Sequence, residues 1–378
     1  MTATRIPTGA DRTLALLEAQ VGRPLAEVET PVAIVDLDRL EANLTELQSY
    51  ADAHEIALWP HTKTHKSPEI GLRQLELGAA GLTVAKTGEA QVFQEAGARN
   101  VLVHYPPFGD VKWERLADLA EAGVSLTVAV DSAPPAEGLG RALARRGLTA
   151  EVLVELDVGQ HRTGATSAAA SVALAGSLAA FPGIEVAGIS SYPGHCRRGD
   201  PDLEAKLRGV DEVLREARDA YDEAGLRCDR ISGGSTPTRH LTHTTCVNEL
   251  RAGTYALLDR NEADDERCAL WVEVTVVSDS VAGQVVVDGG SKTFTSDPYP
   301  DGGHGSVIGM PAASFVRVNE EHGYVDVSAV DDRPALGEHL QIVPNHACGC
   351  INLHDGALAV RDGVVDHVIR IAGRGLIR

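Results

Sequence analysis

The sequence has few aromatic residues, few cysteines and no long apolar run, and each shortage excludes a class of protein. Aromatic residues make up 4% of the 378 residues, so a surface on which nucleic-acid bases stack is not expected. No window of about 18 apolar residues occurs, which excludes a transmembrane helix. The six cysteines are too few and too scattered for the disulfide framework of a small secreted domain.

Basic residues are also scarce relative to acidic ones. The 34 Lys and Arg against 54 Asp and Glu give a net charge of -20. Because an acidic surface repels phosphate backbones and anionic bilayers, neither nucleic acid nor a membrane is expected as a partner. The first 20 residues lack the apolar core of a signal peptide, since Asp11 and Arg12 interrupt them. We therefore expect a cytoplasmic protein with reduced thiols.

Short apolar runs alternate with amphipathic segments from about residue 31 to 236. The runs rich in Val, Ile and Leu are 31–37, 55–60, 81–85, 100–105, 125–130, 151–158, 184–190 and 228–232. They lack a regular polar alternation, which is typical of parallel strands buried on both faces. The amphipathic segments predict helices, several of which end in glycine. Eight strands with intervening helices predict an α/β fold, a (β/α)8 TIM-type barrel.

The alternative to the barrel is a doubly wound open sheet, which usually has fewer strands and a glycine-rich turn after the first strand. Residues 31–44 contain no glycine, which favours the barrel. After about residue 259, alternating apolar and polar residues with turn signals predict a C-terminal antiparallel β domain. We predict a barrel domain over 29–258 and the β domain over 259–378.

Chemistry in such a barrel is expected where strands end. The second run is followed by His61, Lys63, His65 and Lys66, and a lysine with a lowered pKa can form a Schiff base with a carbonyl group. The alternative is a solvated polar loop. The eighth run ends in 232–238 (SGGSTPT), whose glycines and hydroxyls can bind an anion. An ordinary glycine-rich turn is the alternative there.

The predicted β domain contains two residues of metal-binding type. His346 and Cys348 lie two apart in PNHACGC, and residues two apart on an extended strand share a face. Imidazole and thiolate suit Zn²⁺, and two protein ligands leave positions open for water or substrate. A buried histidine beside small cysteines is the alternative. A second set, His240, His243 and Cys246, is interpreted as a polar helix and loop.

Seven stretches together resemble the fold-type III pyridoxal phosphate (PLP) enzymes related to alanine racemase. The similarity is greater to the branch of D-threonine aldolase and D-serine dehydratase. The stretches are 30–44, 60–90, 155–164, 192–195, 232–238, 249–255 and 344–348. PHTKTHK together with PNHAC is specific to this branch. The resemblance covers the chain from residue 30 to about 350.

The resemblance implies a set of site residues. They are Lys63 for the Schiff base with PLP, Arg162 and Tyr192 near its ring, Gly234, Ser235, Thr236 and Tyr255 for its phosphate, and His346 and Cys348 for a divalent metal. It also implies that residues 1–28 pack on the β domain and that the protein is a homodimer. His195 follows the family's pattern but receives no firm role, and Cys350 receives none.

The function that the resemblance implies is that of a PLP- and metal-dependent lyase acting on β-hydroxy-D-amino acids. Dehydratases of this branch carry cysteine as the second metal ligand, which suits Zn²⁺, whereas the aldolases tend to carry a carboxylate, which suits Mn²⁺ or Mg²⁺. Cys348 therefore favours β-elimination of D-serine or D-threonine to a 2-oxo acid and ammonia over retro-aldol cleavage to glycine and an aldehyde.

Three further points follow from the resemblance. Gly349 and Cys350 replace the Pro-Thr pair that commonly follows the ligand cysteine, which leaves the substrate side chain open. A racemase would need a second acid/base from the partner chain and no metal. A non-catalytic PLP-binding protein of this superfamily would lack the C-terminal β domain.

Overall fold

The computed structural model describes residues 8–299 and 302–378, and the chain folds into two compact units. Residues 45–63, 70–253 and 376–378 form one of them, which we call the barrel unit. The other described segments, 8–44, 64–69, 254–299 and 302–375, form the β unit. Residues 1–7 of the predicted N-terminal segment lie outside the described residues.

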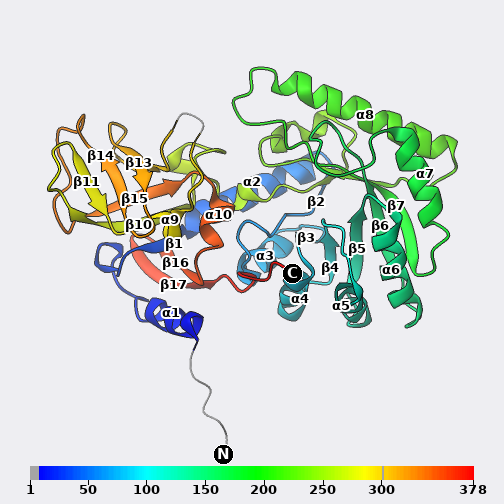
Figure 1. The fold of residues 1–378 in the computed structure, drawn as a ribbon, viewed down its shortest axis with the longest axis horizontal. Coiled ribbons are helices and arrows are strands. Elements are labelled where there is room, and N and C mark those ends of the chain that lie inside the picture. The colour runs from blue at the N-terminus through cyan, green and yellow to red at the C-terminus, as the bar shows by residue number, and fades with distance from the viewer. Residues whose placement is uncertain (1–7, 300–301) are drawn as a thin grey trace, which may run out of the picture. The chain divides into compact units, whose positions relative to one another are not determined.

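Eight parallel strands form the sheet of the barrel unit, in the order β2-β9-β8-β7-β6-β5-β4-β3 (Figure 1). Their bounds are Ala57–Leu58 (β2), Leu82–Val84 (β3), Asn100–Val103 (β4), Ser125–Val130 (β5), Ala150–Glu155 (β6), Ile184–Ser190 (β7), Arg230–Gly233 (β8) and Glu249–Leu250 (β9). Backbone hydrogen bonds from Thr62 to Thr83 and from Thr83 to Pro60 link β3 to the segment after β2. The predicted barrel fold is confirmed.

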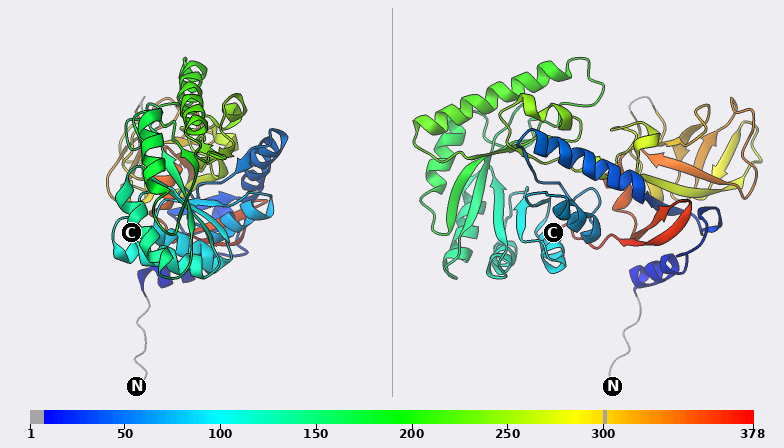
Figure 2. Two further views of the ribbon diagram at one scale, coloured as in Figure 1. Left: turned by 90° about the vertical axis from the view of Figure 1, so that its right-hand side faces the viewer. Right: turned by 180° about the vertical axis from the view of Figure 1, so that it is seen from behind.

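Helices alternate with the strands of this sheet along the chain (Figure 1). They are α2 (Leu37–Ala53), α3 (Pro68–Glu76), α4 (Thr87–Ala96), α5 (Asp110–Glu121), α6 (Ala133–Ala144), α7 (Ala168–Leu178) and α8 (Leu203–Glu223). The long helix α8 packs beside α7, as Figure 2 also shows. Its buried residues Leu207, Val210 and Leu214 recur at spacings of three and four, the pattern of a helix with one apolar face.

The prediction that residues 31–37 form a strand of the barrel was wrong. The run at 31–37 forms β1 (Val32–Asp36), which pairs with strands of the β unit and not with β2. The eighth barrel position is taken instead by β9, which pairs with β8 and β2. Because β1 is buried on both faces in its own sheet, its composition alone could not tell which sheet it joins. The domain ranges 29–258 and 259–378 stay predictions.

The β unit contains a nine-stranded sheet that is antiparallel apart from the parallel pair β1–β16. Its other strands are β10 (Leu270–Ser278), β11 (Gln284–Val287), β12 (Gly305–Val307), β13 (Ser314–Val318), β14 (Gly323–Asp326), β15 (His339–Pro344), β16 (Gly356–Arg361) and β17 (Val364–Arg370). Helix α1 (Gly9–Glu18) packs against β16 and β17, and the short helices are α9 (Ser291–Phe294) and α10 (Ala347–Ile351). The antiparallel β domain expected after residue 259 is thus present.

The described residues also contain four short 3₁₀ helices: Leu25–Glu27 (η1), Arg239–Thr244 (η2), Thr254–Ala256 (η3) and Asp265–Arg267 (η4). Among the described residues, no helix combines the length and the apolar character that crossing a bilayer requires.

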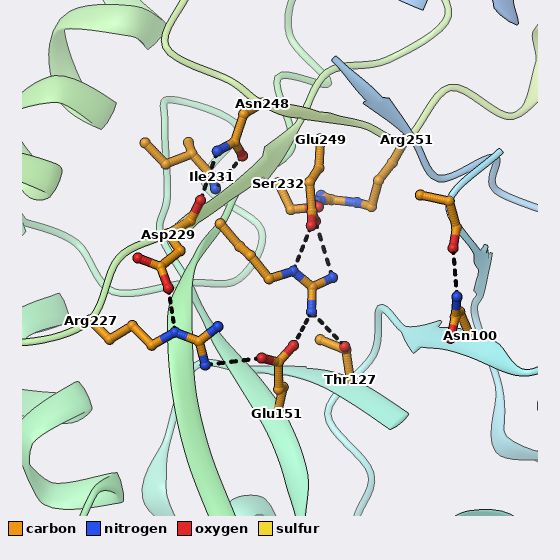
Figure 3. Close-up of polar contacts among 12 residues, drawn as sticks. Asn100, Thr127, Glu151, Arg227, Asp229, Ile231, Ser232, Asn248, Glu249 and Arg251 are labelled. Atoms are coloured by element: carbon orange, nitrogen blue, oxygen red, sulfur yellow. Dashed lines mark hydrogen bonds and ion pairs between the residues drawn. The ribbon is translucent and has the colours of Figure 1, made fainter. Parts of the chain in front are cut away.

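Arg230 links four strands of the barrel, and Figure 3 shows its partners Thr127, Glu151 and Glu249. Arg230 in β8 donates two hydrogen bonds to Glu249 in β9, one to Glu151 in β6 and one to Thr127 in β5. The side chains of Arg230 and Glu249 are 13% and 8% exposed, so water screens their charges little. Strand β9 has only two residues and therefore forms few backbone hydrogen bonds with its neighbours. The side-chain hydrogen bonds of Arg230 add further contacts between β9 and the rest of the sheet.

Replacing Arg230 by methionine is expected to lower the free energy of unfolding by about 3–5 kcal/mol, because it leaves the Glu249 carboxylate buried without its counter-charge. Urea unfolding measures the change. The control is Arg227→Met, whose ion pairs with Glu151 and Asp229 form at a side chain 46% exposed and should contribute less than about 1 kcal/mol. Equal losses in the two variants would contradict the role of Arg230.

Candidate active site

Lys63 lies just after β2, at the carboxyl end of the barrel strands, and its side chain is half-buried. Its Nζ is 5.7 Å from the centre of the Tyr192 ring. Arg162, which follows β6, places its guanidinium carbon 4.7 Å from the centre of the same ring. The structure therefore brings these three predicted residues together around one tyrosine. Cations near an aromatic face are attracted to it, which restricts their positions.

A carboxylate and a hydroxyl group lie close to the Arg162 side chain. Glu155 lies 3.9 Å from the Arg162 guanidinium and accepts a hydrogen bond of 2.7 Å from the Thr163 hydroxyl. These residues and Tyr192 line a shallow depression together with Gln160. The strand ends thus form a polar surface with two cations and one buried carboxylate.

The glycine-rich loop after β8 has the close packing of an anion cradle. Gly234 has a φ of +76°, and a Cβ there would lie 2.5 Å from Cδ1 of Leu250. A Cβ on Gly233 would lie 2.8 Å from the Ser191 hydroxyl oxygen. Within the described residues, this Ser191 oxygen is buried and has no hydrogen-bond partner. A side chain on Gly233 or Gly234 would therefore occupy the space beside the loop in which an anion could bind.

Hydroxyl groups are held in fixed places in the same loop. The backbone N–H of Ser235 donates to the Thr238 hydroxyl at 3.1 Å, and the two hydroxyls are also 3.1 Å apart. Ser235 and Thr236 are both buried. Tyr255, in η3, is buried as well but belongs to the β unit. Three of the four predicted phosphate residues thus share one loop.

The sequence analysis missed a buried network centred on Arg251. Its guanidinium donates to the Ser232 hydroxyl and to the Ser191 carbonyl oxygen, and it lies 3.1 Å from Nε2 of His104. The His104 nitrogen also lies 2.8 Å from the Ser190 hydroxyl. Arg251 stands directly after β9, so recognition of that two-residue strand would have placed it at a strand end.

Burial and cations keep two histidines of the barrel neutral. Loss of hydration lowers the pKa of His61 and of His104 well below the ordinary value of 6.5, and the nearby charges of Lys63 and Arg251 lower both further. Burial also lowers the pKa of Arg251, to about 10. A neutral His104 can accept the hydrogen bond that Arg251 donates.

These two histidines predict a loss of stability in mild acid. Because their pKa values are lowered by folding, the unfolded chain binds more protons below about pH 6.5, and each histidine then removes about 1.4 kcal/mol of stability per pH unit. Urea unfolding of the wild type and of His104→Gln between pH 7.5 and 5 measures the effect. The variant should show the shallower decline. An identical decline would contradict a buried neutral His104.

His346 and Cys348 do not lie on a strand, so the extended geometry expected for them was wrong. Strand β15 ends at Pro344, and His346 precedes the short helix α10, which contains Cys348. The Ala347 N–H donates to the Asp259 carboxylate at 2.8 Å. This contact starts the helical turn. The interaction with the Cys348 thiol and with the nearby carboxylates raises the pKa of the His346 imidazole to about 9.

The donor pair is compatible with a metal that has only two protein ligands. In the described parts of the chain, no three His, Cys, Asp or Glu side chains are arranged to hold an ion together. Asp259, close to the pair, is buried, and this burial raises its pKa to about 8. An adjacent imidazole and thiol suit Zn²⁺ and leave positions open to water or substrate.

The second cysteine–histidine set has other contacts. His240 and His243 lie in η2, and His243 Nδ1 is 2.8 Å from the Tyr50 hydroxyl. His240 forms an ion pair of 3.1 Å with Glu46. Burial raises the pKa of the Cys246 thiol to about 11. These contacts agree with the interpretation of a polar segment.

His195 and Cys350 have structural contacts that the sequence could not reveal. The His195 ring packs against Gly159, where a Cβ would lie 3.2 Å from Cε1, and its buried Nδ1 has no hydrogen-bond partner in the described structure. The Cys350 thiol is fully buried and donates to the Thr293 carbonyl oxygen at 3.3 Å. Burial raises its pKa to about 12, so Cys350 is an unreactive thiol.

Comparison with protein families finds two matching domains. Residues 35–260 match the alanine racemase N-terminal domain. Residues 269–360 match a serine dehydratase domain. Among individual proteins, the chain is 37% identical over 371 residues to a D-threonine aldolase from Arthrobacter sp., covering 95% of this chain and 96% of the relative.

Solved structures show the same similarity. D-threonine aldolase from Filomicrobium marinum matches with a TM-score of 0.89 and 33% identity, over 96% of this chain and 100% of that chain. D-threo-3-hydroxyaspartate dehydratase from Delftia sp. HT23 matches with a TM-score of 0.83 and 29% identity, over 92% and 98%. Variants of a dehydratase of that name, with alanine for a histidine and for a cysteine two positions later, also match, and the cysteine variant is in a metal-free form.

Proposed function

Since the chain belongs to the fold-type III family with an alanine racemase N-terminal domain, in the branch of D-threonine aldolase and D-serine dehydratase, we propose that it is a PLP- and metal-dependent lyase. Its substrates in this proposal are β-hydroxy-D-amino acids. Its reaction is β-elimination, which yields a 2-oxo acid and ammonia. A homodimer and a cytoplasmic location remain predictions from the sequence.

The barrel unit supplies residues that fit PLP. Lys63 is the residue for the Schiff base, and Arg162 and Tyr192 are assigned to the ring. The narrow loop with Gly234, Ser235 and Thr236 is assigned to the phosphate, and a phosphate role for Tyr255 stays a prediction from the family resemblance. The fit is supported by the glycine packing of the loop and by the buried, unpaired hydroxyl of Ser191 facing it. Bound PLP supplies an electron sink for the bonds at the substrate Cα.

The chain's own groups then have separate tasks. The amine of Lys63, once free, takes the proton from the substrate Cα, as a general base. The guanidinium of Arg162 and the ring of Tyr192 restrict one another through their cation–π contact, and so hold their side of the site in place. Arg251 and His104 fix the strand ends through direct contacts with Ser190, Ser191 and Ser232.

His346 and Cys348 are the proposed ligands of the divalent metal, with Zn²⁺ favoured over Mn²⁺ or Mg²⁺. A bound metal supplies a Lewis acid for the β-hydroxyl of the substrate. His346 precedes the short helix α10 and Cys348 lies within it, so both donors belong to one short segment.

Cys348 is the observation that favours β-elimination. It replaces the carboxylate that aldolases of this branch tend to carry at that position. The dehydratase of similar fold, whose variants lack a histidine or a cysteine two positions apart, has a metal-free form when the cysteine is replaced. The matching pair in this chain supports the same chemistry here.

Retro-aldol cleavage is the second candidate. The identities of 37% and 33% to two D-threonine aldolases favour it. Incubation with D-threonine separates the two reactions, since elimination yields 2-oxobutyrate and ammonia whereas cleavage yields glycine and acetaldehyde. We expect 2-oxobutyrate. If glycine and acetaldehyde are the main products, the proposed β-elimination is wrong and the protein catalyses retro-aldol cleavage.

A further inference from the structure

The Cys348 sulfur lies between two threonine hydroxyls. The Thr64 hydroxyl is 3.2 Å from it, and the Thr254 hydroxyl is 3.7 Å from it. The Thr64 side chain is fully buried, and its residue follows Lys63 directly in the chain. A buried hydroxyl with a sulfur in hydrogen-bond range directs the sulfur's remaining lone pairs away from itself. Thr64 therefore restricts where Cys348 can bind an ion.

The backbone between the two ligands is fixed from another side. Asp259, 1% exposed, accepts hydrogen bonds from the Ala347 N–H at 2.8 Å and from the Asn261 N–H at 3.1 Å. Ala347 is the residue between His346 and Cys348. Its peptide orientation sets the directions in which both side chains leave the backbone.

The His346 ring has its own carboxylate neighbour. Its Nδ1 lies 3.8 Å from the Asp297 carboxylate, so a proton on Nδ1 leaves Nε2 free for a metal. The Asp297 carbonyl oxygen accepts a hydrogen bond of 2.9 Å from the Asn345 side chain. The segment 295–297 is thereby tied to the residue that precedes His346.

Segment 295–297 also occupies the space beside Gly349. A Cβ there would lie 2.7 Å from Cγ2 of Thr295 and 3.5 Å from the Asp297 carboxylate. Thr295 has a φ of +80° and a ψ of 174°, a strained backbone conformation for a residue with a side chain. The surrounding contacts must hold it there. Gly349, where the family commonly has proline, makes room for this segment.

We propose that Thr64, Asp259 and Asp297 are the positioning residues of the metal pair. This inference rests on the proposed metal role of His346 and Cys348. Each of the three acts on a different part of the pair: the sulfur, the connecting peptide and the ring. Partners that orient metal ligands typically change metal affinity by about 10- to 100-fold when they are removed. The three together set the affinity and the choice of ion.

Metal affinity of the purified full-length protein tests this inference without any assay of activity. Zinc dissociation constants are measured by competition with a chromogenic chelator, and cobalt(II) loading reports the thiolate–metal charge-transfer band. Thr64→Val should weaken zinc binding by about 10-fold or more and shift the cobalt band, whereas Thr64→Ser should restore both. A serine that fails to restore them would overturn the role of the hydroxyl.

The ring and the peptide have their own variants. Asp297→Ala should weaken zinc binding by about 10-fold and leave the cobalt charge-transfer band in place, because the sulfur is not its target. Asp279→Ala, at an exposed carboxylate of the same unit, is the control and should change neither. Asp259→Asn should weaken binding at least as much as Asp297→Ala. Circular dichroism checks that each variant is folded.

Two results would overturn the inference. One of them leaves the proposed function intact, and the other overturns the proposed function as well. Unchanged zinc affinity in folded Thr64→Val and Asp297→Ala, with Cys348→Ala losing zinc, overturns the inference and leaves the proposed function intact. Equal zinc affinity in the wild type and Cys348→Ala overturns the metal pair itself, and with it both proposals.

Discussion

Replacing Lys63 by alanine is expected to lower lyase activity by about 10⁴-fold or more and to remove the visible absorbance of bound PLP. In the proposed function the same amine forms the Schiff base with the cofactor and takes the substrate proton. A general base alone typically contributes 10²–10⁴-fold, and the covalent attachment adds to this. Absorbance spectra of the reconstituted protein and the rate of 2-oxo acid release measure the two effects.

Lys66 provides a matched control for this variant. It lies three residues further along the same segment, but its ammonium group donates a hydrogen bond of 2.8 Å to Asn352. Lys66→Ala should therefore keep the absorbance that Lys63→Ala loses. An unaltered PLP spectrum in Lys63→Ala would contradict the assignment of the cofactor lysine.

Cys348→Ala is expected to abolish zinc retention and to lower β-elimination by about 10³-fold. A Lewis acid at the leaving hydroxyl contributes several kcal/mol, and each 1.36 kcal/mol corresponds to a factor of ten in rate. With the sulfur gone, His346 is the single remaining protein ligand of the pair. Metal content after dialysis and the steady-state rate with D-serine measure the two effects.

Cys350→Ala is the control, because it removes a thiol from the same short helix. The Cys350 thiol is buried against the Thr293 carbonyl oxygen, so this variant should retain zinc at the wild-type ratio. Loss of zinc in Cys350→Ala together with retention in Cys348→Ala would reverse the assignment of the two cysteines.

The sequence predicts the barrel because each of its longer strands is a run of consecutive apolar residues that can be recognised without knowing the strand's partners. Apolar runs such as 125–130 and 184–190 became β5 and β7 almost residue for residue. The two errors concern strands whose identity depends on partners. The run at 31–37 pairs with strands more than 230 residues away, as in the contact of Val32 with Glu273. Strand β9 has two residues, too few to show any period.

The same distinction applies to the site. The barrel rule that chemistry lies at strand ends predicts Lys63, and the family resemblance adds Arg162 and Tyr192, which also follow strands. Arg251 and His104 are 147 residues apart, and their contact depends on strands from opposite parts of the chain. The turn at α10 depends on Asp259, 88 residues before Ala347. No local pattern around PNHAC could show it.

The metal's partners are the part of the site least accessible from sequence. Thr64 and Cys348 are separated by 284 residues, and Asp297 lies 49 residues before His346. A motif can identify ligands because the ligands share a short segment. The residues that orient them come from several segments and become visible only in the folded chain.

Ammonia and pyruvate release from D-serine, followed on one protein sample in three metal states, tests the central claim most directly. The samples are the PLP-loaded protein with zinc, the same protein after chelation, and the chelated protein with zinc restored. The account predicts equal amounts of ammonia and pyruvate, a rate lower by about 10³-fold after chelation and full recovery with zinc. An undiminished rate in the zinc-free protein would contradict it.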